Sequence, residues 1–457
     1  MADLASRPAV RTRPCSCPEP LPCECSYVTL LRARARAAGR FAAGEPLLRN
    51  GHLLAASSVL AAGLGAVFWI FATRWYSADT VGRSSAALSA VALLSVIGQF
   101  NLGDVLVRFV PGAGRHTRRL VLRCYAVSAV GSAVAAIGFL LLLPWIAPKL
   151  GYLRGPLVAG AFVAATVGYS LFVLQDSALT GLRRAGWVLG ENALFAVAKA
   201  AVLAICAALA VGAGILLSWS VALVVSIAVT SVVLFRWAIP AHQRADRAGA
   251  PRPDRVMRFA AADYLGMLFS LGPYTVVSLL VLDRLGAAQN AYFSLTWLIS
   301  YPCYLAALGM GNSLVVEAAH APERLAEHGR RVLRHTAFLV AVATVVLVVV
   351  APWVLSLFGA QYAQHGTTVL RLMALGALPN VLPTVAVDVA RARRALPWVI
   401  GLQVAYAVLA VGMVGLFLPL FGLTGVAMAM LFAHCALALP LLLALPRWLP
   451  KPARRLG

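Results

Sequence analysis

Long apolar runs dominate the chain from residue 52 onward. Each has about 20 residues or more, the length that an α-helix needs to cross a hydrocarbon core of about 30 Å. The runs lack the polar–apolar alternation of half-buried soluble elements. They lie near residues 52–74, 84–110, 120–147, 156–181, 188–212, 215–239, 257–282, 288–312, 336–358, 367–390, 397–419 and 422–446. The pattern predicts an all-α polytopic membrane protein with about 12 transmembrane helices.

The loops between these runs differ in charge. If the amino terminus lies inside, the inner loops and the carboxyl-terminal tail hold about 24 Arg or Lys. The outer loops then hold only Arg74, Arg83, Lys149, Arg154 and Arg284. Cytoplasmic loops of membrane proteins carry such an excess of basic residues. We therefore predict that both termini are cytoplasmic.

The composition agrees with a membrane protein and changes the interpretation of the charge. Of the 457 residues, 61% are hydrophobic and only 12% are charged, whereas soluble domains are about a quarter charged. A net charge of +23 would ordinarily suggest a nucleic-acid partner. Because the basic residues lie in short loops beside apolar runs, we expect membrane lipids as their partners and no nucleic acid. The scarcity of Lys among the 39 basic residues suggests the codon bias of a GC-rich bacterium.

Polar segments divide the chain. Residues 1–49 are rich in Pro and Arg and are predicted to be a disordered basic cytoplasmic tail. In this tail, Cys15, Cys17, Cys23 and Cys25 form two C-x-C pairs, which are tighter than the usual C-x2-4-C of zinc sites, so no metal is predicted. The remaining predicted parts are an N-terminal six-helix lobe (50–239), a cytoplasmic linker (240–256), a C-terminal six-helix lobe (257–446) and a basic cytoplasmic tail (447–457).

Two short motifs recur in both predicted lobes. Arg-Arg-Ala followed by Trp occurs at 183–187 and again at 393–398, an offset of about 210 residues. Val81-Gly82 and Leu285-Gly286 recur at an offset of about 204. Because six helices are an even number, such repeats are parallel and are related by a pseudo-two-fold axis along the membrane normal.

Several stretches carry a family resemblance that spans about residues 50–445. They are FWIFATRWYSADTVGRSSAALSAVALLS (68–95), LGDVLVRFVP (102–111), ALTGLRRAGWVLGENALF (178–195), LRLMALGALPNVLP (370–383) and PLFGLTGVAMAML (419–431). In these stretches the chain resembles the polysaccharide flippases of the multidrug/oligosaccharidyl-lipid/polysaccharide exporter superfamily. The resemblance implies two six-helix lobes around a cleft that opens alternately to each side. It further implies a lipid-linked saccharide substrate, polysaccharide assembly proteins as partners, no cofactor, and a place in the bacterial cytoplasmic membrane.

Basic residues inside the apolar runs are candidates for binding that substrate. A charge at mid-bilayer costs at least about 2.5–3.5 kcal/mol, so each one needs a reason. Lys199 lies near the centre of its run and is placed to meet a substrate phosphate; the alternatives are a pair with Glu191 or another acid, or snorkelling. Arg371, Arg74 and Arg108 are the other candidate cleft charges.

Acidic residues supply the candidates for coupling or gating: Asp104, Asp263 and Glu191. Asp104 precedes Arg108 by four residues, so the two share a helix face and can pair. The alternative for these acids is a structural pair with a nearby basic residue.

Other function classes lack their motifs. The sequence contains no G-x-x-x-x-G-K-[ST] nucleotide loop, and its membrane part has no nucleophile motif or His/Cys metal cluster. We therefore expect no enzyme and no catalytic residues, and a membrane glycosyltransferase or polymerase is disfavoured. The closer alternative is a cation-coupled multidrug antiporter of the same superfamily. Such exporters commonly use an acid in helix 1, and the segment from His52 to Trp75 contains none, which favours the flippase.

Overall fold

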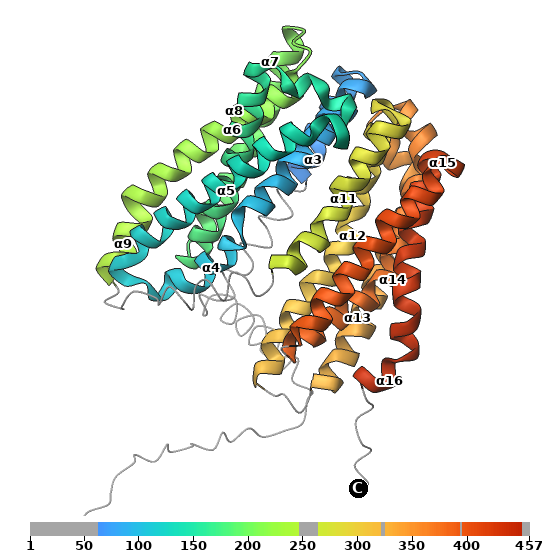
Figure 1. Ribbon diagram of the computed structural model, residues 1–457. Helices are drawn as coiled ribbons and strands as arrows, with labels where there is room; N and C mark the ends of the chain where they lie inside the picture. The colour runs from blue at the N-terminus through green and yellow to red at the C-terminus, as the bar shows by residue number, and fades with distance from the viewer. Residues whose placement is uncertain (1–62, 246–263, 321–324, 394, 450–457) are drawn as a thin grey trace, which may run out of the picture. The chain divides into compact units, whose positions relative to one another are not determined.

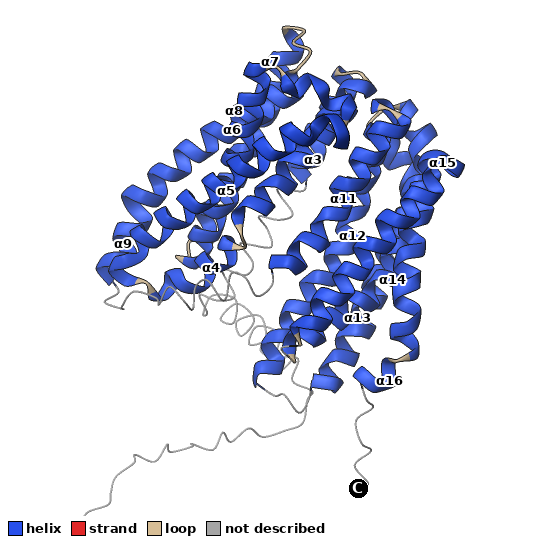
Figure 2. Ribbon diagram, viewed as in Figure 1, coloured by secondary structure: helices blue, strands red, loops and turns tan. Residues whose placement is uncertain are grey.

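A computed structural model describes residues 63–245, 264–320, 325–393 and 395–449 of the chain. Within these residues the structure is helical and contains no β-strand (Figure 2). Residues 63–245 are called the N-terminal half below, and residues 264–449 the C-terminal half (Figure 1). The predicted tail 1–49 lies outside the described residues. Of the predicted linker 240–256 the structure describes only residues 240–245, and of the predicted tail 447–457 only residues 447–449.

The N-terminal half begins with a helical segment, residues 63–75. It continues with α3 (Ala78–Gln99), α4 (Leu102–Phe109), η1 (Val110–Gly112), η2 (Gly114–His116), α5 (Thr117–Ile146), η3 (Pro148–Arg154), α6 (Pro156–Gly181), α7 (Ala185–Ala208), α8 (Gly214–Val233), η4 (Leu234–Ala238) and α9 (Ile239–Ala245). The C-terminal half contains α11 (Tyr264–Leu285), α12 (Ala287–His320), α13 (Leu325–Ser356), α14 (Ala360–Ala392), α15 (Leu396–Leu443) and α16 (Leu445–Trp448).

Nine helices of the described chain are long and apolar enough to cross a membrane. One of them, α15, has 48 residues and is interrupted at Gly422 (φ 58°, ψ −138°), so it comprises two spans. Helix α12, with 34 residues, is also long enough to cross a membrane, and the helical segment 63–75 precedes α3. The prediction of an all-α polytopic protein with about 12 spans is therefore confirmed.

Three predictions of helix limits are wrong. The run 84–110 is not one helix, because Phe100 and Asn101 adopt left-handed backbone angles that end α3. A separate helix, α4, begins at Leu102. The helix beginning is also missed, since Ser77 caps α3 by accepting a hydrogen bond from the Thr80 amide. The residues 313–335, between the predicted runs 288–312 and 336–358, are not a loop throughout, because α12 continues to His320 and α13 starts at Leu325. Hydropathy detects the part of a helix inside the membrane and not its polar extension.

Small residues allow close helix packing within the N-terminal half. Gly98 on α3 lies against Gly131 and Ser132 on α5, where a side chain at Gly98 would collide with the α5 backbone. Helix α6 packs against α3, α5 and α8, and α7 packs on α8. In the C-terminal half, α14 contacts α12, α13 and α15. Close contact through small residues is typical of membrane helices, which gain little from hydrophobic burial in lipid.

The two halves meet along α3, which contacts both α11 and α12. The side-chain amide of Asn290 on α12 donates to the carbonyl of Gly82 (2.8 Å), and Ser278 on α11 donates to Asn290 (2.9 Å). Further along α3, the Tyr264 hydroxyl donates to the Ile97 carbonyl at 2.6 Å. Gly82 is required at this crossing because any Cβ there would collide with the Ala287 backbone. The interface is thus held by buried polar contacts as well as by packing.

The first internal repeat corresponds to a shared turn. After α6, the Arg184 amide donates a hydrogen bond to the Leu179 carbonyl, five residues earlier. After α14, the Ala395 amide donates to the Ala390 carbonyl in the same way. In each case the next helix starts with a Trp amide bonded three residues back, Trp187 and Trp398. The second repeat does not hold, because Val81 and Gly82 lie inside α3 whereas Leu285 ends α11.

Large apolar side chains remain exposed on the outer helices. Leu141 on α5 is 69% exposed, Val224 on α8 is 66% exposed and Phe338 on α13 is 72% exposed. A soluble protein rarely shows contiguous apolar surface of this kind. These faces fit a hydrocarbon environment.

Candidate functional site

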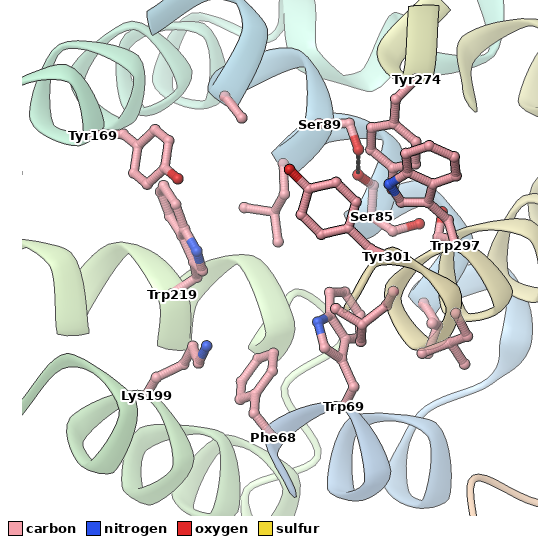
Figure 3. Close-up of a pocket in the computed structure, with 16 residues that line it drawn as sticks. Phe68, Trp69, Ser85, Ser89, Tyr169, Lys199, Trp219, Tyr274, Trp297 and Tyr301 are labelled. Carbon is pink, nitrogen blue, oxygen red and sulfur yellow. Dashed lines mark hydrogen bonds between the residues drawn. The ribbon is translucent and has the colours of Figure 1, made fainter. Parts of the chain in front are cut away.

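A cavity of about 340 Å³ lies where the two halves meet (Figure 3). The N-terminal half contributes the segment 63–75 and helices α3, α6, α7 and α8, and the C-terminal half contributes α11 and α12. Seven of its 16 lining residues are aromatic, and Ser85, Ser89 and Lys199 are among the polar ones.

Lys199 supplies the positive charge of this cavity. Its side chain extends from α7, is 8% exposed, and places Nζ 4.4 Å from the ring centre of Phe68 and 5.0 Å from that of Phe195. Phe195 is four residues earlier on the same helix, so both side chains share one face. The ring faces attract the ammonium group. Within the described part of the chain, no carboxylate forms an ion pair with Lys199, and the pair with Glu191 left open by the sequence is not formed.

Aromatic side chains form two walls around the cavity. On the N-terminal side, the Trp219 ring lies 5.4 Å from that of Tyr169 and 6.0 Å from that of Phe195. On the C-terminal side, Trp297 stacks on Tyr274 (5.1 Å, 20°) and contacts Tyr301. Figure 3 shows Lys199 and Trp219 across the cavity from Trp297 and Tyr301. The cavity therefore combines one cation with broad aromatic faces.

The sequence analysis missed these aromatic residues. Interfacial Trp residues mark the ends of membrane helices. Trp297, in contrast, lies ten residues inside α12, which spans residues 287–320. A Trp well inside a span is the signal that would have indicated a lining residue.

The other candidate basic residues lie elsewhere. Arg74 is exposed and donates to the Leu357 carbonyl (3.1 Å), just after the end of α13. Arg371 is exposed and donates to the Val348 carbonyl (3.0 Å) on α13. Arg108 is exposed on α4. Of the four predicted substrate-binding residues, Lys199 is the one that lines this cavity.

The two described candidate acidic residues, Glu191 and Asp104, lie on different helices. Glu191, on α7, is 3% exposed and lies beside Asp176 on α6. Neither Glu191 oxygen has a hydrogen-bond donor, whereas Asn192 donates to both Asp176 oxygens at 3.3 and 3.1 Å. Asp104 is exposed on α4 and lies outside this pair. Asp263 lies outside the described residues.

The charge and the aromatic lining of the cavity suit a ligand that has both an anionic group and an uncharged part. The described residues contain no group of three or more His, Cys, Asp or Glu side chains that would hold a metal ion. An ammonium group without an acidic partner attracts an anion, and in this sheltered position the attraction is weakly screened by water. The aromatic walls provide contact area for an uncharged part of the same ligand.

No protein-family model matches the chain, and no curated protein matches its sequence. Solved structures do match its fold. The lipid II flippase MurJ in an inward closed conformation has a TM-score of 0.64 at 13% identity, covering 86% of this chain and 87% of that one. An inward-facing multidrug resistance MATE family transporter of the MOP superfamily has a TM-score of 0.57 at 16% identity, covering 84% and 96%.

A third structure is a MOP superfamily transporter from Pyrococcus furiosus, described as having a binding pocket of reversed polarity. It has a TM-score of 0.62 at 15% identity and covers 90% of this chain and 98% of that one. At such identities the likeness establishes the fold. The chain therefore shares the all-helical fold of these three transporter structures.

Proposed function

We propose that the protein flips a lipid-linked oligosaccharide or polysaccharide precursor across the bacterial cytoplasmic membrane by alternating access. The observation that carries the proposal is Lys199, a cation without a carboxylate partner in the described chain, facing a cavity between the two halves. Lipid-linked saccharides carry a phosphate or pyrophosphate between lipid and sugar. Lys199 would hold that group while the lipid chain stays in the membrane.

A multidrug antiporter is the second candidate, because several solved structures with this fold are MATE transporters. Drugs exported by cation exchange are commonly cationic. Lys199 repels a cation placed in the same cavity, and the described cavity offers no carboxylate to offset that repulsion. The charge of the cavity thus favours the anionic substrate.

We further propose that Glu191 couples transport to a proton. Two adjacent buried carboxyl groups cannot both ionise without a large cost, so they share a proton readily. Asp176 is fixed by Asn192, whereas Glu191 has no donor. Glu191 is therefore the member of the pair that is placed to gain and lose the proton.

The test is deletion of the gene followed by complementation with Lys199 variants. Surface polysaccharide, accumulated lipid-linked precursor and protein level are measured together. Lys199→Arg keeps the charge but changes a compact ammonium into a planar fork, so partial export is expected. Lys199→Ala is expected at normal protein level but without export, because removal of an unpaired buried charge does not destabilise the fold. Lys199→Glu is expected to be worst, because it repels the phosphate.

Lys149→Ala is the matched control, since Lys149 is an exposed lysine in η3 that does not line the cavity. It should export as the wild type does. Normal export from Lys199→Ala at normal protein level would contradict the proposal. Loss of both protein and export would make Lys199 a structural residue.

A further inference from the structure

A second cavity, of about 400 Å³, lies within the C-terminal half. Helices α11, α12, α14 and α15 line it. It shares Tyr274, Trp297 and Tyr301 with the cavity that contains Lys199. One aromatic wall therefore borders both cavities, and a single elongated ligand can contact both.

The charge of the second cavity differs from that of the first. Its two charged lining residues, Asp388 and Arg391, form an ion pair at 3.9 Å. A ligand therefore meets little net charge here, in contrast to the unpaired ammonium of Lys199. A phosphate favours the first cavity, and an uncharged group is better suited to the second.

The polar groups of the second cavity are suited to hydroxyl groups. Asn380, Thr384, Gln403 and Tyr406 line it. Gln403 Oε1 and Asp388 Oδ2 are buried and have no hydrogen-bond donor in the described chain. Buried acceptors without donors are unfavourable and are rare in native structures. A ligand that brings several hydroxyl donors would satisfy them.

The aromatic wall complements these polar groups. Trp297 contacts Tyr274, Tyr301 and Tyr304, with ring centres between 5.1 and 5.8 Å apart. Such a surface packs against the C–H face of a pyranose ring, while the ring hydroxyls point to amide and carboxylate groups. Specific ligand sites commonly combine apolar walls with a few convergent polar groups in this way.

We infer that this second cavity is the saccharide subsite and that it accepts uncharged pyranose units attached to the phosphate held by Lys199. The inference rests on the proposed function, because it takes the phosphate-bearing lipid as the substrate. It adds a division of labour: the N-terminal half holds the charged linkage and the C-terminal half selects the sugar.

The test measures the affinity of the purified full-length protein in detergent for two kinds of lipid. One is undecaprenyl pyrophosphate without sugar. The other is the same lipid bearing a single glucose, galactose, mannose, N-acetylglucosamine or N-acetylgalactosamine. At least one glycosylated lipid should bind the wild type about tenfold more tightly than the sugar-free lipid, as a few extra hydrogen bonds provide.

Variants then separate the two subsites. Gln403→Leu and Asn380→Leu should bring this tenfold ratio close to one and leave the affinity for the sugar-free lipid unchanged. Tyr406→Phe removes one hydroxyl at nearly constant volume and should reduce the ratio in part. Because it preserves the packing, its result can be interpreted even if the other two variants misfold. Gln361→Leu, an exposed residue on α14 that lines neither cavity, is the matched control and should change nothing.

The possible failures are distinct. The saccharide subsite is wrong if no sugar improves binding to the wild type, or if the ratio survives in the folded cavity variants. The proposed function is wrong if the sugar-free lipid does not bind, or if Lys199→Ala leaves its affinity unchanged. With both correct, Lys199→Ala weakens both lipids equally and keeps the ratio.

Discussion

At the level of single residues, Lys199 differs from the other basic residues singled out in the membrane part. Arg74 and Arg371 each donate to a backbone carbonyl on or just after α13. Lys199 instead lies over two aromatic rings and lines a cavity. A guanidinium that donates hydrogen bonds to helix carbonyls has a structural role. The ammonium of Lys199 has no such structural role in the described chain, and we therefore propose that it binds the substrate.

Substitution of Glu191 tests the carboxyl pair at the same scale. Glu191→Gln should fold with a melting temperature at or above that of the wild type, because the neutral amide cannot ionise beside Asp176 and can donate a hydrogen bond to it. Transport should lose its dependence on a pH gradient. Measurements of melting temperature and of transport at matched and unmatched pH check both expectations.

Asp176→Ala is the comparison for this variant. It removes one of the two acceptors of the Asn192 side-chain amide, which also donates to the Val188 carbonyl, and should lower stability by about 1 kcal/mol, as the loss of one hydrogen bond does. A Glu191→Gln protein whose transport still responds fully to the pH gradient would exclude Glu191 as the coupling residue.

Part of the candidate site could be predicted from the sequence. Lys199 was identifiable because a charge within a 24-residue apolar helix is rare and costly. Trp219, Trp297 and Tyr274 were not identified, because an aromatic residue in an apolar run has no desolvation cost; the position of Trp297 well inside α12 was the one indication of a lining residue. The neighbours of Glu191 could not be predicted from the sequence either, because Asp176 approaches Glu191 only through the packing of α6 on α7.

At the level of helices, α3 and α12 cross in close contact between the halves at Gly82 and Ala287. Gly82→Leu should separate these helices, because its side chain would enter the Ala287 backbone, and should also displace the Asn290 hydrogen bond. We expect a large loss of folded protein, measured as the monodisperse fraction in size-exclusion chromatography. Gly138→Leu on α5 is the control, as nothing lies within 4 Å of its added Cβ. Equal yields of the two variants would refute this account of the interface.

Helix positions were predictable where hydropathy changes sharply, and less so where backbone geometry decides. The run 156–181 coincides with α6 because Pro156 starts that helix and Gly181 ends it. The break between α3 and α4 depends on left-handed angles at Phe100 and Asn101, which leave no trace in hydropathy. The polar ends of α12 and α13 were missed for a related reason, since helix formation there does not require apolar residues.

At the level of the whole molecule, the charge bias of the loops predicts the orientation. A background in which Cys15, Cys17, Cys23, Cys25 and Cys435 are replaced by Ser removes the tail cysteines and the one exposed native cysteine of the described residues. Lys149→Cys in η3 should react with a membrane-impermeant maleimide in intact cells, and Arg244→Cys in α9 only after permeabilisation. Both positions are exposed. The reverse labelling pattern would overturn the predicted topology.

The central claim is that this fold carries a lipid-linked saccharide through the cavity lined by Lys199. In the most direct measurement, the purified protein is reconstituted in vesicles with lipid-linked saccharide extracted from the membranes of the organism that makes the protein. A membrane-impermeant oxidant of sugar diols is added outside the vesicles. The measured quantity is the rate at which the saccharide of the inner leaflet, the inner pool, becomes accessible to this oxidant. Wild-type and Lys149→Ala vesicles should expose the inner pool, and Lys199→Ala vesicles with equal protein should not. Exposure at the same rate from wild-type and Lys199→Ala vesicles, or no faster from the wild type than from protein-free vesicles, would contradict the claim.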